Sequence, residues 1–406
     1  MKRTIGSLLA LMLALGCAGA QQVDPSKAGF DPARLAQLRT EFQSYVDRNQ
    51  TSGTVTLVAR KGQVVSLEAV GWRDMEAKDP MKTDSLFQIA SMTKPVTAIG
   101  ILMLEEEGKL STDDPVEKHL PEFRGQQLIT KKEGSTITLG KPARPITLKD
   151  LLTHTSGLRG GTPPGFGDLY SKRNRTLAEA TIAVSQWPLE FEPGSKWAYC
   201  NTGIDTLGRV IEVCSGKSYE AFLDERLFQP LGMKDTFFYP TAANKDRVAV
   251  LYKKDKDKLA RSENFLGDAV GGRFPLPAGG LFSTAPDMVK LYQMMLDRGT
   301  AGGRRYLSEA SVEKMTRNHT GDLRAGFTDG IVMGLGWQLV GTPTGVTEML
   351  APGTFGHGGA FGTQGWIDPK KGMIYILMVQ RSGFPNGDAS DLRKSLQSIA
   401  VAALKE

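Results

Sequence analysis

The chain has 406 residues, a formal charge of +6 and three cysteines, with 40% apolar and 23% charged side chains. This composition is that of a globular protein of two or three domains or one large two-part fold. It excludes wholesale disorder and a disulfide-built scaffold. The charge is modest and no basic stripe is interleaved with aromatic residues, which argues against nucleic acid as a partner.

The first predicted element is a secretory signal peptide over residues 1–20. A basic start and a short apolar run lead to a small-residue cleavage site at Ala18 and Ala20. The alternative is lipidation at Cys17, although Ala14 stands where such sites usually carry leucine. We therefore expect an exported protein, periplasmic or secreted, with no transmembrane span once the peptide is removed.

The mature part, 21–406, alternates strand-like and helix-like patterns. The predicted elements are, in chain order, a helix over 31–49, hairpin strands over 54–58 and 64–70, a buried helix over 91–107, helices over 202–214, 219–228 and 286–297, strands over 355–368 and 373–379, and a closing helix over 389–404. Residues 125–145 resemble an insertion that could shape a cleft.

Strand-like segments at both chain ends, with helices between them, predict an α/β (α+β) fold. We expect one antiparallel sheet completed by both termini, flanked by the N- and C-terminal helices, with an inserted all-helical domain. The sheet part is placed at roughly 30–90 and 300–406, and the helical part at roughly 95–290.

The sequence offers an unusual route to a nucleophile. The four histidines lack metal-ligand spacing, and G-x-S-x-G, G-x-G-x-x-G and Walker loops are absent, so we expect neither metal nor cofactor. Ser91 and Lys94 share one face at the start of the buried helix, where a lysine should have a lowered pKa and be able to take a proton from serine. The same spacing recurs at Ser311 and Lys314, but polar surroundings there favour an exposed helix face.

Two further segments carry candidate site residues. Tyr199 and Asn201 are spaced so that an extended chain would turn both toward one cleft. His357, Gly358 and Gly359 lie in a strand-like run whose glycines suggest the close approach of another backbone. Judged alone, the first segment also fits a buried tyrosine beside a helix cap, and the second a β-bulge or tight turn.

Taken in this order, the three segments resemble the serine β-lactamase and penicillin-recognising superfamily. The similarity is greatest to the class C branch, with its DD-peptidases, D-aminopeptidases and family VIII esterases, and it spans roughly residues 30–400. Other stretches that resemble this group are Asp114-Pro115-Val116, Leu151-Leu152-Thr153-His154-Thr155-Ser156-Gly157-Leu158, Pro230-Leu231-Gly232-Met233 and Ala278-Gly279-Gly280-Leu281. The resemblance implies a β-lactamase/transpeptidase-like fold and a serine hydrolase.

The resemblance also implies residue roles. Ser91 is the acylated nucleophile, Lys94 activates it, and Tyr199 is a general base, as a phenolate held by Lys94, and the proton donor to the leaving group. Which of Lys94 and Tyr199 takes the first proton stays open.

The same resemblance assigns residues to substrate binding. Asn201 orients the substrate or Lys94, and His357, Gly358 and Gly359 line the substrate. The backbone N–H groups of Ser91 and Ala360 form the oxyanion hole. His154 is expected to be structural.

One departure limits the expected activity. Class C β-lactamases have Lys-Thr-Gly where this chain has His357, Gly358 and Gly359. A neutral imidazole favours substrates without a required carboxylate, so the first hypothesis is an acyl-enzyme hydrolase of small esters or D-amino-acid amides or peptides. The alternatives are a β-lactamase or DD-carboxypeptidase acting on β-lactams or D-Ala-D-Ala peptides, and a non-catalytic penicillin-binding-like sensor. The oligomeric state does not follow from the sequence.

Overall fold

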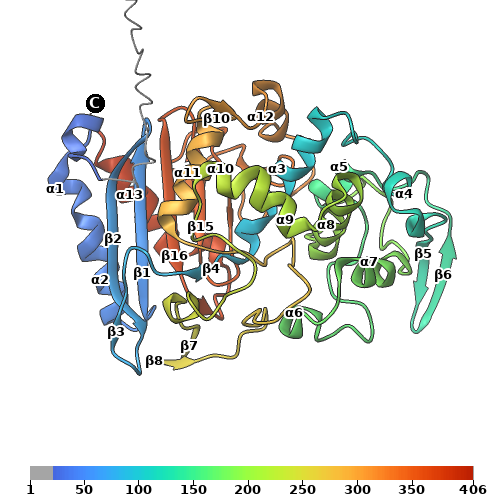
Figure 1. The fold of residues 1–406 in the computed structure, drawn as a ribbon, viewed down its shortest axis with the longest axis horizontal. Helices are drawn as coiled ribbons and strands as arrows, with labels where there is room; N and C mark the ends of the chain where they lie inside the picture. Colours follow the sequence, from blue (N-terminus) through green and yellow to red (C-terminus); the bar gives the residue numbers. More distant parts are fainter. Residues whose placement is uncertain (1–21, 406) are drawn as a thin grey trace, which may run out of the picture.

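The computed structural model describes residues 22–405, so the predicted signal peptide and Cys17 lie outside the described residues. Figure 1 shows a large sheet with helices on both faces and a helix-rich part beside it. The sheet has eight strands in the order β12-β13-β14-β15-β16-β1-β2-β3. Its strands are β1 Gly53–Arg60, β2 Gln63–Asp74, β3 Asp79–Pro80, β12 Ile331–Met333, β13 Gln338–Val340, β14 Phe355–Gly358, β15 Gln364–Asp368 and β16 Met373–Val379.

All neighbouring strands of this sheet pair antiparallel. At its centre β16 pairs with β1, with Leu57 opposite Ile376, so the two chain ends complete one sheet. This confirms the predicted fold class. The predicted strand over 355–368 is two strands instead, because the chain reverses between β14 and β15, where Gly359 N–H donates to the Thr363 carbonyl at 2.7 Å.

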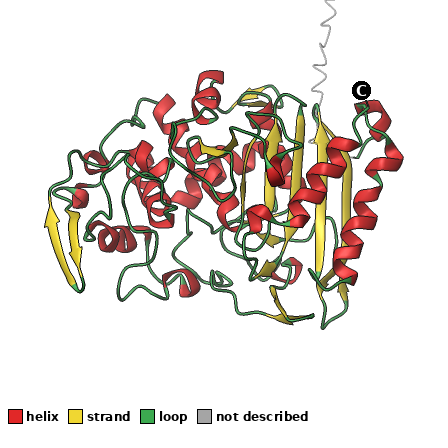
Figure 2. Ribbon diagram, turned by 180° about the vertical axis from the view of Figure 1, so that it is seen from behind, coloured by secondary structure: helices red, strands yellow, loops and turns green. Residues whose placement is uncertain are grey.

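The central strand β16 is buried on both faces, which explains its uninterrupted apolar sequence. Successive side chains of a strand point to opposite faces. Ile374 and Ile376 therefore join one core, and Tyr375 and Leu377 join the other. Figure 2 shows long helices lying against the sheet on the side of the second core. The helices of that side are α1 Pro32–Leu35, α2 Gln37–Asp47 and α13 Asp391–Ala402.

On the opposite face, α11 (Ala285–Leu296) and α3 (Thr93–Glu106) carry the first core into the helix-rich part. The other main helices there are α5 Leu148–Leu152, α7 Leu177–Ser185, α8 Asn201–Ser215 and α9 Tyr219–Leu223, the last continued by a π-helical turn over Asp224–Phe228. The predicted buried helix begins at Thr93, and a 3₁₀ turn over Ala90–Met92 precedes it.

The inserted part also holds two β-hairpins, β5 Leu128–Glu133 with β6 Thr136–Gly140, and β7 Tyr252–Asp255 with β8 Lys258–Arg261. The β5–β6 hairpin lies in the segment that the sequence marked only as an insertion, and its β-branched threonines and isoleucines favour strands. It lies at the end of the molecule farthest from β1 and β2 (Figure 1).

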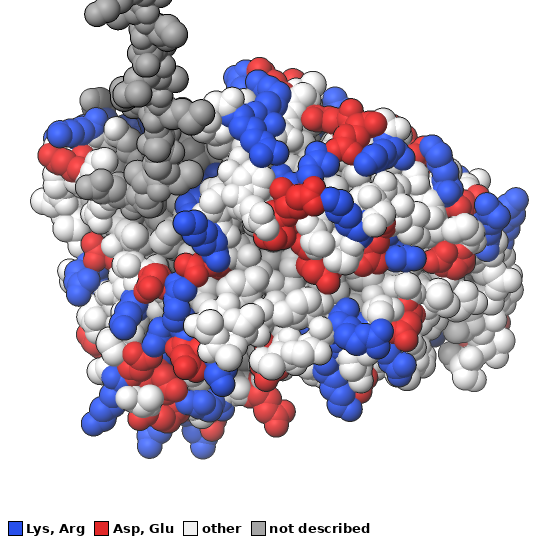
Figure 3. Space-filling view, in the orientation of Figure 1, with Lys and Arg blue, Asp and Glu red and all other residues white. Residues whose placement is uncertain are grey.

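The described surface carries charges of both signs side by side on the face shown in Figure 3. Within residues 22–405, none of the helices combines the length and the apolar composition that crossing a membrane requires.

A close backbone contact joins the sheet to the start of α3. Thr363 Oγ1 donates to the Ile89 carbonyl at 3.1 Å, and a Cβ atom at Gly359 would lie 2.4 Å from that same carbonyl oxygen. Only glycine leaves room there, so the predicted approach of another backbone is found at this position.

We expect Gly359→Ala to lower the free energy of unfolding by about 1–3 kcal/mol, because the added methyl group forces β14 and the turn before α3 apart. Thermal or urea unfolding measures this loss. Gly167→Ala is the matched control, since a Cβ atom there meets nothing within 4 Å. Equal stability of the two variants would contradict the close packing.

Candidate active site

Ser91 lies in the 3₁₀ turn over Ala90–Met92, just before α3. The residue before it, Ala90, has a φ of 47°, a left-handed conformation that costs a non-glycine residue about 1–3 kcal/mol. Two hydrogen bonds hold this turn: Thr93 Oγ1 donates to the Ala90 carbonyl at 2.7 Å and accepts from the Leu281 N–H at 3.2 Å. The strained turn leaves the Ser91 side chain partly exposed at a cavity.

Lys94 lies one helical turn after Ser91 and is fully buried. Its Nζ donates to Ser91 Oγ at 2.9 Å and to the Ala278 carbonyl at 2.6 Å. Burial lowers the pKa of Lys94 to about 7, while the negative charge of Asp205 opposes this shift. The lowered pKa is the one that the apolar helix predicted, and it leaves a large neutral fraction of the amine near pH 7.

Tyr199 is the third side chain that lies beside the Ser91 hydroxyl and the Lys94 amine. Its ring lies 4.7 Å from Lys94 Nζ, and its hydroxyl shares a hydrogen bond with the Ser91 side chain. Burial of the hydroxyl raises the pKa of Tyr199 well above its usual value, and the Ser91 hydrogen bond offsets only part of this rise. This environment does not favour the resting phenolate that the resemblance implied.

His154 positions the loop that carries Tyr199. Its Nδ1 accepts the Cys200 backbone N–H at 3.2 Å, its carbonyl accepts the Ala198 N–H at 2.9 Å, and its ring centroid lies 4.7 Å from that of Tyr199. Burial lowers the pKa of His154 well below its usual value, so the ring is neutral. These contacts agree with the expected structural role.

The glycine-rich strand forms the facing wall of a cavity of about 410 Å³. Its lining residues include Ser91 and Tyr199, and with them His357, Gly358, Gly359, Ala360, Phe327, Phe384, Pro385, Asn386, Gly387 and Asp388. In the described part of the chain, no hydrogen bond engages the backbone N–H of Ser91 or of Ala360. Both groups are thus available to an oxyanion, and their role as its hole stays a prediction.

His357 presents an acceptor rather than a cation. Its Nδ1 lies 2.7 Å from the Gly358 carbonyl oxygen, which can only accept, so Nδ1 carries the proton and Nε2 a lone pair. Nε2 is buried and has no partner in the protein. Burial, reinforced by Lys94, lowers the pKa of His357 to about 4, so the ring is neutral at pH 7.

Asn201 is less clearly part of this arrangement. It is the first residue of α8 and is partly exposed. Within residues 22–405 it neither lines the cavity beside Ser91 nor hydrogen-bonds Lys94. Its role toward substrate or Lys94 therefore stays a prediction without support from a contact.

Sequence reasoning missed three residues of the site. Asp205 is buried beneath Lys94, and its Oδ1 accepts the Ala278 N–H at 2.9 Å, while Ala278 in turn accepts from Lys94. Asp388 and Phe327 both line the cavity, and the Phe327 ring stands edge-on to Tyr199 at 4.8 Å. A carboxylate on the apolar side of a predicted helix was a usable signal for Asp205. Asp388 lies in a 3₁₀ turn of three residues and Phe327 in a loop, and such short or irregular segments carry no periodic signal.

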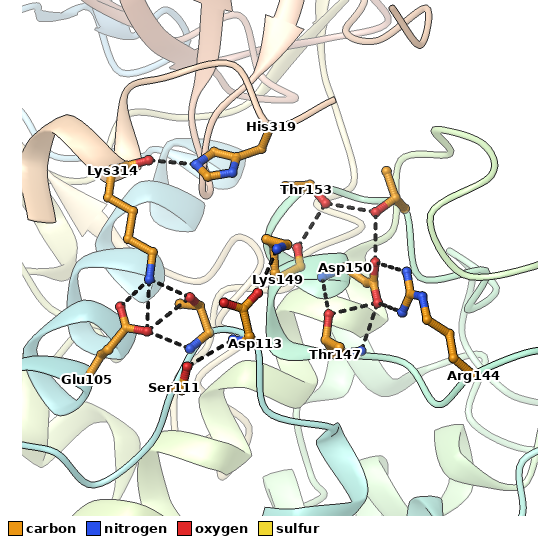
Figure 4. Close-up of polar contacts among 12 residues, drawn as sticks. Glu105, Ser111, Asp113, Arg144, Thr147, Lys149, Asp150, Thr153, Lys314 and His319 are labelled. Carbon is orange, nitrogen blue, oxygen red and sulfur yellow. Dashed lines mark hydrogen bonds and ion pairs between the residues drawn. The ribbon is translucent and has the colours of Figure 1, made fainter. Parts of the chain in front are cut away.

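The second serine-lysine pair has a different environment, and Figure 4 shows the lysine of this pair, Lys314, beside Glu105. Lys314 Nζ lies 2.8 and 2.9 Å from the two Glu105 oxygens and 2.7 Å from Thr112 Oγ1. Ser311 is buried and bonds Ser308 rather than the lysine. The pair is therefore not the exposed face that we expected, but an anchor between α3 and α12 (Glu309–Met315), and a carboxylate-paired lysine is a poor base.

Known proteins are similar to this chain in sequence and in fold. A family model described as Beta-lactamase matches residues 38–398. Esterase EstB of Burkholderia gladioli is 30% identical over 389 residues, which cover 88% of this chain and 94% of the esterase. A putative D-alanyl-D-alanine carboxypeptidase of Escherichia coli K12 is 28% identical over 426 residues, covering 96% of this chain and 93% of that protein.

The solved structure of EstCE1, a hydrolase with promiscuous acyltransferase activity, has a TM-score of 0.75 and 24% identity, and covers 92% of this chain and 99% of that one. This likeness concerns the fold. Because the family model spans most of the chain, and because EstB matches nearly end to end, the chain belongs to the beta-lactamase family of serine hydrolases.

Proposed function

We propose that this chain is an exported hydrolase that forms an acyl-enzyme on Ser91 and acts on small esters or on D-amino-acid amides or peptides. The observation that carries the proposal is the 2.9 Å hydrogen bond between Ser91 Oγ and the buried amine of Lys94, whose pKa is about 7. Such an amine is neutral often enough to accept the serine proton and basic enough to hold it.

In the proposed acylation, Ser91 Oγ attacks the substrate carbonyl carbon while its proton passes to Lys94 Nζ. The carbonyl oxygen gains the negative charge and is held by the N–H groups of Ser91 and Ala360. Lys94 is the first base, because the raised pKa of Tyr199 keeps the phenol protonated.

Collapse of the tetrahedral intermediate then breaks the bond to the leaving group. The Tyr199 hydroxyl supplies the proton to the departing oxygen or nitrogen. The Lys94 ammonium, which lies 4.7 Å from the centre of the Tyr199 ring, then returns the serine proton directly to the Tyr199 phenolate, because the acylated Ser91 oxygen has no proton to relay. Deacylation runs in reverse. Water loses a proton to the Lys94 amine and attacks the acyl carbon, and the Lys94 ammonium gives that proton to Ser91 Oγ as the acyl bond breaks.

The cavity supports a substrate with an apolar part and without a required carboxylate. Phe327, Phe384 and Pro385 give it an aromatic and apolar wall. His357 offers a neutral acceptor where a lysine would bind a carboxylate. The similarity to Esterase EstB points to the same ester chemistry. Export is proposed from the N-terminal pattern of residues 1–20 alone.

A second candidate function is that of a DD-carboxypeptidase or β-lactamase, which the 28% identity to the Escherichia coli carboxypeptidase favours. Turnover of nitrocefin or of a D-Ala-D-Ala peptide above ester turnover would select it. A non-catalytic sensor is the outcome if neither a fluorophosphonate nor a penicillin probe labels Ser91.

We expect a p-nitrophenyl ester of a short acid to give a burst of p-nitrophenol equal to the enzyme concentration, and Ser91→Ala to abolish it. Stopped-flow absorbance and intact-protein mass measure the burst and the acyl adduct. Ser311→Ala is the matched control, because it alters the other serine-lysine pair and should retain the burst. Turnover that survives in Ser91→Ala refutes the proposal.

The pH profile tests Lys94 as the base. Because the amine must be neutral, kcat/KM should fall as pH drops below about 7. Asp205 stabilises the ammonium form, so Asp205→Asn should move this acidic limb to lower pH. Asp287→Asn, at a second buried carboxylate outside this contact, should leave the limb in place. A limb that stays at the same pH in Asp205→Asn contradicts the assignment.

A further inference from the structure

The cavity beside Ser91 has a negative wall. Of its described lining residues, Asp388 is the one acidic side chain, and Lys and Arg are absent from the lining. The titratable groups that the charge of Asp388 acts on are Tyr199, His357, which is neutral at pH 7, and Arg393, while the amine of Lys94 hydrogen-bonds Ser91. A substrate that enters this cavity therefore meets a carboxylate before it meets a full positive charge.

The Asp388 carboxylate is held by neutral groups. Oδ1 accepts from Gln364 Nε2 at 2.9 Å, and Oδ2 accepts from Gln338 Nε2 at 3.1 Å. Arg393, the nearest buried cation, donates to the Asp388 main-chain carbonyl at 2.8 Å and stacks over Trp366 at 3.8 Å. In the described chain no ion pair joins Arg393 to the Asp388 carboxylate, so amides fix its position without cancelling its charge by direct contact.

The carboxylate also accounts for the glycine at 358. A Cβ atom there would lie 1.9 Å from Asp388 Oδ1 and 2.5 Å from Gln364 Nε2. Asp388 thus occupies the space into which a side chain of this strand position would project. Glycine at 358 and the carboxylate of Asp388 therefore require each other. Where class C β-lactamases have a threonine hydroxyl, which can donate, this cavity wall has a carboxylate, which accepts.

We propose that Asp388 is a specificity-determining residue that excludes substrates carrying a carboxylate near the scissile bond and favours neutral or ammonium-bearing ones. The proposal rests on the proposed Ser91 chemistry. Unlike charges attract and like charges repel at full strength only where water is scarce, as at this buried wall. The expected order of kcat/KM, after correction for intrinsic reactivity, is ammonium above neutral above carboxylate.

The test compares charged and neutral esters in wild type and in Asp388→Asn. One series places the charge on the leaving group: 4-acetoxybenzoate, its methyl ester and (4-acetoxyphenyl)trimethylammonium. A second places it on the acyl chain: the mono-p-nitrophenyl ester of adipic acid against p-nitrophenyl hexanoate. The readout is the ratio of kcat/KM for the charged and the neutral ester, because comparison of this ratio between variants cancels the intrinsic reactivity of each ester.

We expect Asp388→Asn to raise the carboxylate-to-neutral ratio at least tenfold in one or both series and to lower the ammonium-to-neutral ratio. Asparagine fits the site, since Gln338 Oε1 is without a partner and can accept the new amide after a flip. Asp391→Asn is the matched control: it removes an exposed carboxylate three residues away that does not line the cavity, and it should leave both ratios unchanged.

A merely structural Asp388 would change the rates of all esters by one factor and leave the ratios alone, and that result overturns the proposal. The proposal is therefore overturned by any result in which the charged-to-neutral ratios of wild type and Asp388→Asn are equal. Failure of the underlying chemistry looks different, because ester turnover would then survive Ser91→Ala, whatever the ratios show.

Discussion

The site depends on one lysine that the fold keeps out of water without pairing it to a carboxylate. Lys94 Nζ has two neutral oxygen partners, the Ser91 hydroxyl and the Ala278 carbonyl. A direct ion pair of the kind that joins Lys314 to Glu105 would favour the ammonium form of Lys94 and would remove its capacity to accept a proton. Burial without a contacting anion is what lowers the pKa to about 7.

Three distant segments must meet for this amine to be useful. The turn before α3 supplies Ser91, the loop before α8 supplies Tyr199, and β14 supplies the opposite wall. The turn before α3 is joined to the turn after β14 by the Ile89 carbonyl, which accepts a hydrogen bond from Thr363 and packs against Gly359. His154 ties the second to α5 through the Cys200 N–H, so each segment is fixed by main-chain contacts rather than by the reacting side chains themselves.

Much of the fold could be predicted because it follows from periodicity. The hairpin β1–β2, the central strand β16 and the helices α3, α8, α11 and α13 all match apolar patterns that burial imposes. The pairing of Ser91 with Lys94 follows from helical spacing. The hairpin β5–β6 and the division of 355–368 into β14 and β15 were not predicted. The β-branched residues of β6 are exposed, so they form no apolar pattern, and the glycines between β14 and β15 were read as part of one strand rather than as a turn.

The unpredicted residues are those whose role comes from tertiary position. Asp388 lies in a short 3₁₀ turn over Gly387–Ala389. Its carboxylate can reach the cavity only because Gly358, thirty positions earlier in the chain, has no side chain. Both carboxylates of the site act through neutral intermediaries: Asp205 through the Ala278 peptide, and Asp388 through two glutamine amides. Asp205 opposes the burial that lowers the pKa of Lys94. Asp388 adds to the burial that raises the pKa of Tyr199, and it partly offsets the burial that lowers the pKa of His357. Since neither touches Lys94, the negative charges shape the cavity while the amine stays free to react.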